Sequence, residues 1–144
     1  MKLNLGLANA IVDETLDEAR RKNAKHVAVM VLDEGGHPIV YKREDGASLF
    51  RFDLARAKAM GALGMGVDTR EITRRAQNNP TFFNTLAVAA QGNIVFSPGG
   101  VLIRDESGDI IGAIGVSGDK GDLDEECAFK GISAAGLYYE VQAK

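Results

Sequence analysis

The sequence predicts an α+β fold in a single domain, residues 1–144, in which helices flank an antiparallel sheet. Apolar, β-branched runs occur in pairs joined by short polar turns, which is typical of hairpins. Helical stripes lie between these pairs instead of following every strand, so the pattern does not favour a doubly wound parallel sheet. The length suits one domain. The predicted order is α-β-β-α-α-β-β-β-α, with five strands.

The first predicted elements are a helix and a hairpin. Residues 5–22 repeat apolar side chains at helical spacing, with charged residues largely on the opposite face. Residues 26–32 are apolar at nearly every position, so we expect a strand with both faces covered, in the interior of the sheet. A polar turn over residues 34–37 leads to a second strand, 38–42, which is followed by a polar loop, 43–47.

Two helices are expected in the middle of the chain, followed by a further short one that the order above does not count. Ser48 is a candidate N-cap for the first of them. Asp68 and Glu71 have the spacing of a capping box, which predicts a short helix over residues 68–77. A further short helix is predicted over residues 81–90, after a chain break at a proline.

The C-terminal third predicts three strands and a helix. The strands cover residues 93–97, 101–104 and 110–116, and the last two are joined by a polar turn into an antiparallel pair. The run 110–116 is so apolar that we expect it, too, in the interior of the sheet. The last helix is predicted over residues 122–141.

Composition narrows the class of protein. The net charge is −3 with acidic and basic residues interspersed, so a nucleic-acid surface is not predicted. The single cysteine excludes an intramolecular disulfide and suits a reducing compartment. The first residues lack a signal-peptide core, and no apolar run approaches the roughly 20 residues that span a bilayer. We therefore expect a cytoplasmic protein without a membrane partner.

Two glycine pairs mark places where the backbone turns tightly or is approached closely. Gly35-Gly36 follows the first predicted strand, and Pro98-Gly99-Gly100 precedes the fourth. Glycine adopts positive φ at no steric cost and leaves no side chain to block a ligand. Each segment is therefore interpreted in two ways, as a plain hairpin turn or as a ligand-contacting segment. The second segment can also present backbone N–H groups to an anion.

An ordered set of motifs resembles a known family. The motifs are Asp33-x-Gly35-Gly36-His37, Arg43-x-Asp45-Gly46, Lys58-Ala59, Pro98-Gly99-Gly100-Val101-x-Ile103, Gly112-Ala113-Ile114-Gly115-Val116-Ser117-Gly118 and the segment from Asp122 to Gly131. They are similar to the GlcG/HbpS-type family, which also includes the C-terminal domain of PduO-type cobalamin adenosyltransferases. The resemblance covers residues 5–136. It implies a five-stranded antiparallel sheet, a homo-oligomer, and haem or tetrapyrrole binding in some members.

His37 is the titratable residue with the clearest functional potential. It lies at the end of a Gly-Gly turn, where an imidazole can enter a cleft for acid–base chemistry or serve as an axial haem ligand. The alternative is a turn-end histidine that faces solvent. His26 precedes a buried strand and is interpreted as an edge or surface residue. With two histidines and one cysteine, no zinc-site spacing occurs and no metal site is predicted.

Charged residues near the next helix form a second group of candidates. Arg43, Asp45 and Arg51 surround a loop, and arginine binds carboxylates in a bidentate fashion. They could hold haem propionates or a small acid, or they could form a solvated salt-bridge loop. Lys58 lies on an apolar helix face, where it either lines a cleft or pairs with an acid.

Two functions follow from these observations. The first is a cytoplasmic, homo-oligomeric protein that binds a small ligand, for which the resemblance implies haem or a related tetrapyrrole. The second is a metal-independent enzyme that acts on a small organic acid by acid–base chemistry, with His37, Arg43 and Lys58 as catalytic candidates. A purely structural domain is a third reading.

The candidate ligand-binding residues define one expected cleft. We expect it to gather the turn 35–37, the stretch 43–51 and the segment 98–100, within one chain or across a subunit boundary. These segments contain the features that a core does not require, namely paired glycines, an imidazole and arginines beside apolar strands.

Overall fold

The computed structural model describes residues 1–140 and confirms a single α+β domain. The helices are α1 (Leu5–Arg21), α2 (Arg51–Met65), α3 (Thr69–Asn78), α4 (Pro80–Ala89) and α5 (Gly121–Ala134). The strands are β1 (Ala28–Asp33), β2 (Pro38–Arg43), β3 (Gly100–Arg104) and β4 (Ile110–Ser117). The expected end of the last helix, residue 141, lies outside the described residues, and α5 ends at Ala134.

The four strands form one antiparallel sheet in the order β2-β1-β4-β3. The two apolar strands β1 and β4 occupy its centre, as the sequence predicts. Ala28 pairs with Arg43 of β2 and with Ser117 of β4, so three strand ends meet at one end of the sheet. The turn that carries His37 lies at the other end.

The predicted strand over residues 93–97 is wrong, and the sheet has four strands among the described residues instead of five. Ile94 is buried in a cluster with Phe83, and the Phe96 ring packs edge-on against Phe83 at 5.9 Å. The apolar side chains of this stretch are therefore used by the α3–α4 hairpin. A strand pattern in the sequence cannot tell a sheet neighbour from a helical one.

The free edge of β3 is covered by the start of α3 and by a C-terminal residue. The Oγ1 of Thr69 accepts a hydrogen bond from the Gly100 N–H at 2.8 Å, and the Oδ1 of Asp68 accepts one from Leu102 N–H at 2.9 Å. Tyr138 forms a two-way backbone bridge with Arg104. These groups take the positions that a fifth strand would occupy.

The same contact explains why the predicted capping box does not form. Asp68 is the N-cap residue of α3, but its side chain makes no capping hydrogen bond because it is bonded to β3. The carboxylate of Glu71 pairs instead with Arg74 and Arg75 on its own helix.

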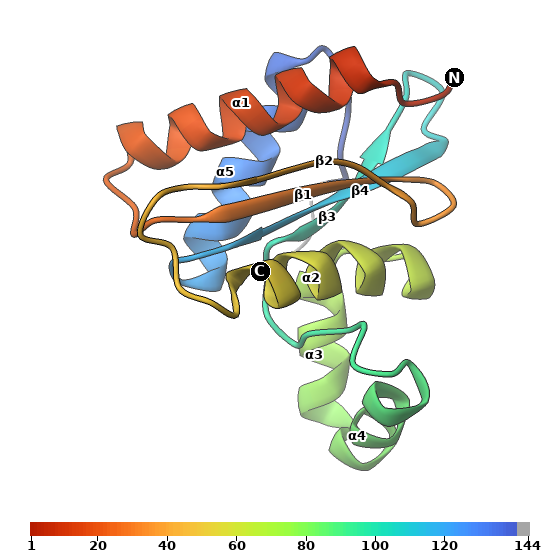
Figure 1. The fold of residues 1–144 in the computed structure, drawn as a ribbon. Helices are drawn as coiled ribbons and strands as arrows, with labels where there is room; N and C mark the ends of the chain where they lie inside the picture. Colours follow the sequence, from red (N-terminus) through yellow and green to blue (C-terminus); the bar gives the residue numbers. More distant parts are fainter. Residues whose placement is uncertain (141–144) are drawn as a thin grey trace.

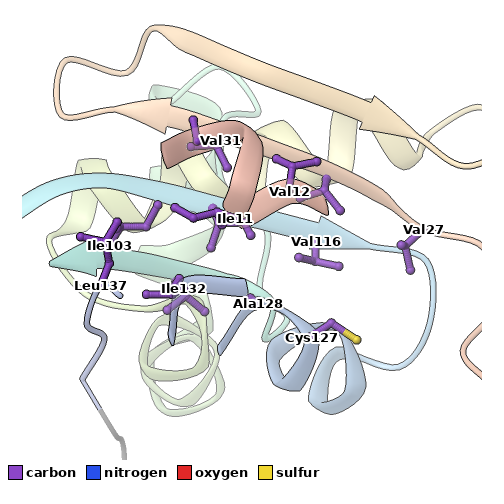
Figure 2. Close-up of a cluster of buried hydrophobic side chains, with 14 of the residues drawn as sticks. Ile11, Val12, Val27, Val31, Ile103, Val116, Cys127, Ala128, Ile132 and Leu137 are labelled. Carbon is purple, nitrogen blue, oxygen red and sulfur yellow. The ribbon is translucent and has the colours of Figure 1, made fainter. Parts of the chain in front are cut away.

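Helices cover both faces of the sheet (Figure 1). On one face, α1 and α5 bury the side chains of Val27, Val29 and Val31. Figure 2 shows part of this cluster, with residues of α1 and α5 meeting those of the strands. On the other face, α2 packs against Met30 and Leu32. The hairpin of α3 and α4 extends away from the sheet below α2 (Figure 1).

Candidate functional site

A cavity of about 430 Å³ lies at the end of the sheet where β1, β2 and β4 meet. This volume falls within the range of roughly 300–1,000 Å³ that is usual for small-molecule sites. Two three-residue segments, from the α1–β1 connection and the loop after β2, form its wall together with the first residue of α2 and the glycine that follows β4. The lining residues are Ala24, Lys25, His26, Gly46, Ala47, Ser48, Arg51 and Gly118.

Arg51 is held in this cavity by two hydroxyl groups. Its Nε donates to the Oγ of Ser48 at 3.1 Å, and its Nη1 donates to the Oγ of Ser117 at 3.1 Å. Ser48 was predicted as the N-cap of α2, but the structure has Phe50 at that position. The Ser48 hydroxyl instead contacts the arginine side chain. The two contacts fix the guanidinium at the cavity wall, and none of the described residues bonds Nη2.

His26 brings an exposed imidazole to the same wall. Its Nδ1 would lie 2.7 Å from a Cβ placed on Gly46, so the ring lies directly against the backbone of that glycine. Within residues 1–140, neither ring nitrogen has a hydrogen-bond partner. Histidine ligates iron through a ring nitrogen whose lone pair is free.

The cavity wall is positively charged. Lys25 and Arg51 supply two cations, and none of the lining residues is acidic. The nearby Asp119 carboxylate accepts hydrogen bonds from the backbone N–H groups of Lys25 and Lys120, and these bonds lower its pKa. The wall therefore favours an anionic ligand group.

Two large, exposed apolar residues adjoin the lining residues in the sequence. Leu49 is 81% exposed and Phe50 is 69% exposed, and both lie in the sequence between the lining residues Ser48 and Arg51. Exposed apolar residues beside a concave site commonly contribute to ligand or protein contacts. The surroundings of the cavity thus combine cations, an imidazole and apolar surface.

His37 lies at the opposite end of the sheet. Its Nδ1 is 3.1 Å from Asp33 Oδ1, which also accepts the backbone N–H groups of Gly35 and His37. These hydrogen bonds lower the pKa of Asp33, and the bond from the His37 backbone N–H contributes most. The His37 side chain is 80% exposed. It borders a smaller cavity of about 270 Å³ whose other lining residues are Lys2, Leu3, Asp33, Glu34, Gly35 and Ile111.

The three segments expected to share one cleft do not meet within one chain. The six residues of β1 separate the turn 35–37 from the loop 43–51 by roughly 20 Å, at about 3.3 Å per residue. Of the three charged candidates in the stretch 43–51, only Arg51 lines the larger cavity, together with Gly46, Ala47 and Ser48 of the same stretch. Arg43 donates a hydrogen bond to the carbonyl of Ala47, and Asp45 is exposed. Neither residue is among those that line the cavity.

The segment Pro98-Gly99-Gly100 lies on the α2 side of the sheet and supports Lys58. Gly99 has φ +125°, and a Cβ there would lie 2.8 Å from Lys58 Nζ. Gly100 is close to the Lys58 carbonyl, and its N–H is donated to Thr69. The glycine pair therefore serves a close approach between loop and helix, and it is not a plain hairpin turn.

Lys58 is the buried partner of an acid. Its Nζ donates to Asp124 Oδ2 at 3.0 Å and to the Val116 carbonyl at 2.9 Å, and the residue is 3% exposed. Burial lowers the pKa of the Lys58 ammonium and raises the pKa of the Asp124 carboxyl, while their mutual attraction opposes both changes. Such a pair ties α2 to α5 and leaves no free amine for catalysis.

Sequence reasoning missed Lys25, His26 and Ser48 as cavity residues. Each looks like an ordinary loop or strand-edge residue, and only the pairing of β1 with β2 and β4 brings them beside Arg51. The sequence did contain one signal, the glycine of the Arg43-x-Asp45-Gly46 motif, since glycine often marks a turn or a close backbone neighbour. In the structure Gly46 has φ +86°.

Residues 1–140 contain neither a metal cluster nor a membrane-spanning helix. No group of three or more histidine, cysteine, aspartate or glutamate side chains there is arranged to hold a metal ion. No helix in the same range is long and apolar enough to cross a bilayer. Cys127 is buried, and burial raises the pKa of its thiol to about 12, so it is not a reactive thiolate.

Comparisons with known proteins agree with this fold. An uncharacterized 15.0 kDa protein from the dhaT-dhaS intergenic region of Citrobacter freundii is 32% identical over 92 residues, which are 64% of this chain. The match spans 63% of that relative's own length. The crystal structure of the PduOC:heme complex superposes with a TM-score of 0.87 at 25% identity, covering 96% of this chain and 98% of that one.

Two more solved structures have the same fold. Klebsiella pneumoniae protein ORFY gives a TM-score of 0.85 at 26% identity, with 94% of this chain and 92% of that chain covered. HbpS gives a TM-score of 0.79 at 28% identity, with 92% and 89% covered. A sequence model of the family described as "Haem degrading protein HbpS-like" matches residues 3–133. The chain therefore belongs to the HbpS-like family.

Proposed function

We propose that this chain binds haem or a related tetrapyrrole, as a homo-oligomer in the cytoplasm. A solved relative of nearly equal length is a haem complex, which supports this ligand class. The observation that carries the proposal is the His26 imidazole, which has no partner among the described residues and faces a cavity that also contains Arg51 and Lys25. The buried single cysteine suits a reducing compartment.

The residues of this cavity fit the chemistry of haem. An imidazole supplies an axial ligand for the iron, and arginine and lysine neutralise the propionates. Leu49 and Phe50 offer apolar surface to the macrocycle. Bound haem would supply an iron centre for redox or ligand-binding chemistry. The chain's own part is to bind the iron through His26 and to orient the propionates through Arg51 and Lys25.

The His37 turn fits haem less well. Its cavity is smaller, and two of its lining residues, Asp33 and Glu34, are acidic and repel propionates. The exposed His37 is therefore a matched control, because it is the second of two histidines in the chain.

A haem titration followed by visible absorption tests the proposal. The parent protein is expected to bind haem and shift its Soret band, and His26→Ala is expected to lower the affinity by about tenfold or more. His37→Ala is expected to bind like the parent. Circular dichroism of both variants controls for folding. Equal binding by His26→Ala and the parent, or loss of binding in His37→Ala alone, would refute the assignment.

A further inference from the structure

We propose that Arg51 selects the ligand by a carboxylate group, and that the cavity also binds small aromatic carboxylates without any iron. The inference concerns the cavity of the proposed function and deepens it by naming the ligand group that is recognised. It can be tested without haem, because a small acid needs neither an axial ligand nor the apolar surface of Leu49 and Phe50.

The Arg51 guanidinium is held in a fixed position. Ser117 is 1% exposed at the end of β4, so its hydroxyl is an immobile acceptor for Arg51 Nη1. Ser48 holds the Nε from the loop side. An arginine fixed in this way loses little side-chain entropy when it binds a carboxylate, and its Nη2 keeps both hydrogens for that purpose.

Among the described residues, no acidic side chain forms an ion pair with Arg51. Lys25 adds a second cation to the wall, which contains no acidic residue. The acids nearby are engaged elsewhere: Asp119 accepts backbone N–H groups, and Glu44 accepts Arg20 and the Val27 N–H. Arg70 and Lys58, by contrast, are both paired with carboxylates of α5. Arg51 is half-buried and donates hydrogen bonds only to hydroxyl groups, so its positive charge is not neutralised and is available to a ligand.

The rest of the wall is formed by small residues. Ala24, Ala47, Gly46 and Gly118 have small or no side chains, and the Nδ1 side of the His26 ring lies close to Gly46. A planar, apolar body fits between such surfaces better than a branched polar one. Benzoate has one carboxylate on one ring, so it is the simplest probe of this combination.

A titration by two-dimensional ¹H–¹⁵N NMR tests the inference, with benzoate as the ligand and benzamide as the uncharged control. Benzoate is expected to shift the amide signals of residues 24–26, 46–48 and 118, and benzamide is not. Arg51→Gln is expected to weaken benzoate binding by roughly 10- to 100-fold, since it removes a charge-assisted hydrogen bond. Arg56→Gln is the matched control, because Arg56 lies on the same helix but donates to Asn93.

The outcomes separate this inference from haem binding. If benzoate binds in an Arg51-dependent way while haem does not bind, the proposed function fails and the inference stands. If haem binds but benzoate leaves these signals unchanged, or binds Arg51→Gln as it binds the parent, the inference is overturned. If Arg51→Gln fails to fold, Arg51→Lys is used instead. This variant keeps the positive charge but loses the planar pair of N–H donors, so benzoate is expected to bind severalfold more weakly.

Discussion

At the scale of single residues, the buried ion pair between Lys58 and Asp124 decides how α2 and α5 are held. Asp124 Oδ1 also accepts the Asp119 N–H at 3.0 Å, so the carboxylate is satisfied on both sides. The sequence placed Lys58 on an apolar face and allowed either a pair or a cleft. It could not name the partner, because Asp124 lies 66 residues away and meets Lys58 only in the folded chain.

Lys58→Met is expected to destabilise the protein by about 3–5 kcal/mol, because it leaves a buried carboxylate without its counter-charge. The double variant Lys58→Met/Asp124→Asn removes the charge, and its amide oxygen can still accept the Asp119 N–H. It is therefore expected to be more stable than Lys58→Met alone. Urea unfolding measures both. A double variant that is the less stable of the two would contradict this view of the pair.

Asp68 predicts a pH dependence of stability. Burial raises its pKa from 3.8 to about 7, and the nearby Glu125 and Glu140 act in the same direction while Arg104 and the Leu102 N–H oppose it. The folded chain thus keeps a proton that the unfolded chain releases above pH 4. Between pH 4 and 7 this group makes the unfolding free energy fall as pH rises, by up to about 4 kcal/mol in total.

Asp68→Asn is expected to remove that slope while its amide oxygen still accepts the Leu102 N–H. The variant should therefore gain stability relative to the parent as pH rises from 4 to 7, and the gain should be constant above pH 8. Urea unfolding at several pH values gives the difference directly, since the slopes of other groups cancel. A difference that does not change with pH would show that Asp68 ionises normally.

At the scale of elements, period-2 and period-3.6 patterns predicted the two central strands and most helices close to their observed positions. The predicted order has four helices, whereas the structure has five, because the further short helix expected over residues 81–90 is a separate element, α4. Residues 26–32 and 110–116 are apolar on both faces because α1 and α5 cover one face and α2 covers the other. The stretch 93–97 shows the limit of this reasoning. It has a strand pattern, but the edge of β3 is already bonded to Asp68 and Thr69, and Ile94 packs with the helical hairpin instead.

The contact between α2 and β4 requires a glycine. A Cβ on Gly115 would lie 1.9 Å from the Ala55 carbonyl oxygen, whereas one on Gly64 would meet no atom within 4 Å. Gly115→Ala is therefore expected to destabilise the protein by about 1–3 kcal/mol or more through overpacking. Gly64→Ala, inside α2, is expected to stabilise it by about 0.5–1 kcal/mol. Thermal unfolding of both variants checks the pair, and equal effects would contradict the close packing.

At the scale of the whole molecule, the sequence predicted the family but not the cavity. The motifs carried the resemblance because they contain the residues that strand pairing and close packing require, such as Gly100 and Gly115. The cavity is built from residues 24–26, 46–51 and 118, which are distant in sequence and unremarkable one by one. Of the residues expected beforehand to bind the ligand, only Arg51 lines it. His37, which the turn made prominent, lies at the other end of the sheet.

The homo-oligomer is also predicted at this scale. Exposed Leu49 and Phe50 on one side of the chain favour association, and the family resemblance implies it. Light scattering at micromolar concentration is expected to give a mass that is a multiple of 15.4 kDa. A mass of one chain at that concentration would rule the prediction out.

The account's central claim is that the cavity around His26 and Arg51 is the ligand site. A crystal structure of the protein grown with haem tests it most directly. The account predicts the iron within bonding distance of His26 Nε2 or Nδ1 and a propionate against the Arg51 guanidinium. Haem bound at the His37 turn, or anywhere else with the His26 cavity empty, would contradict it.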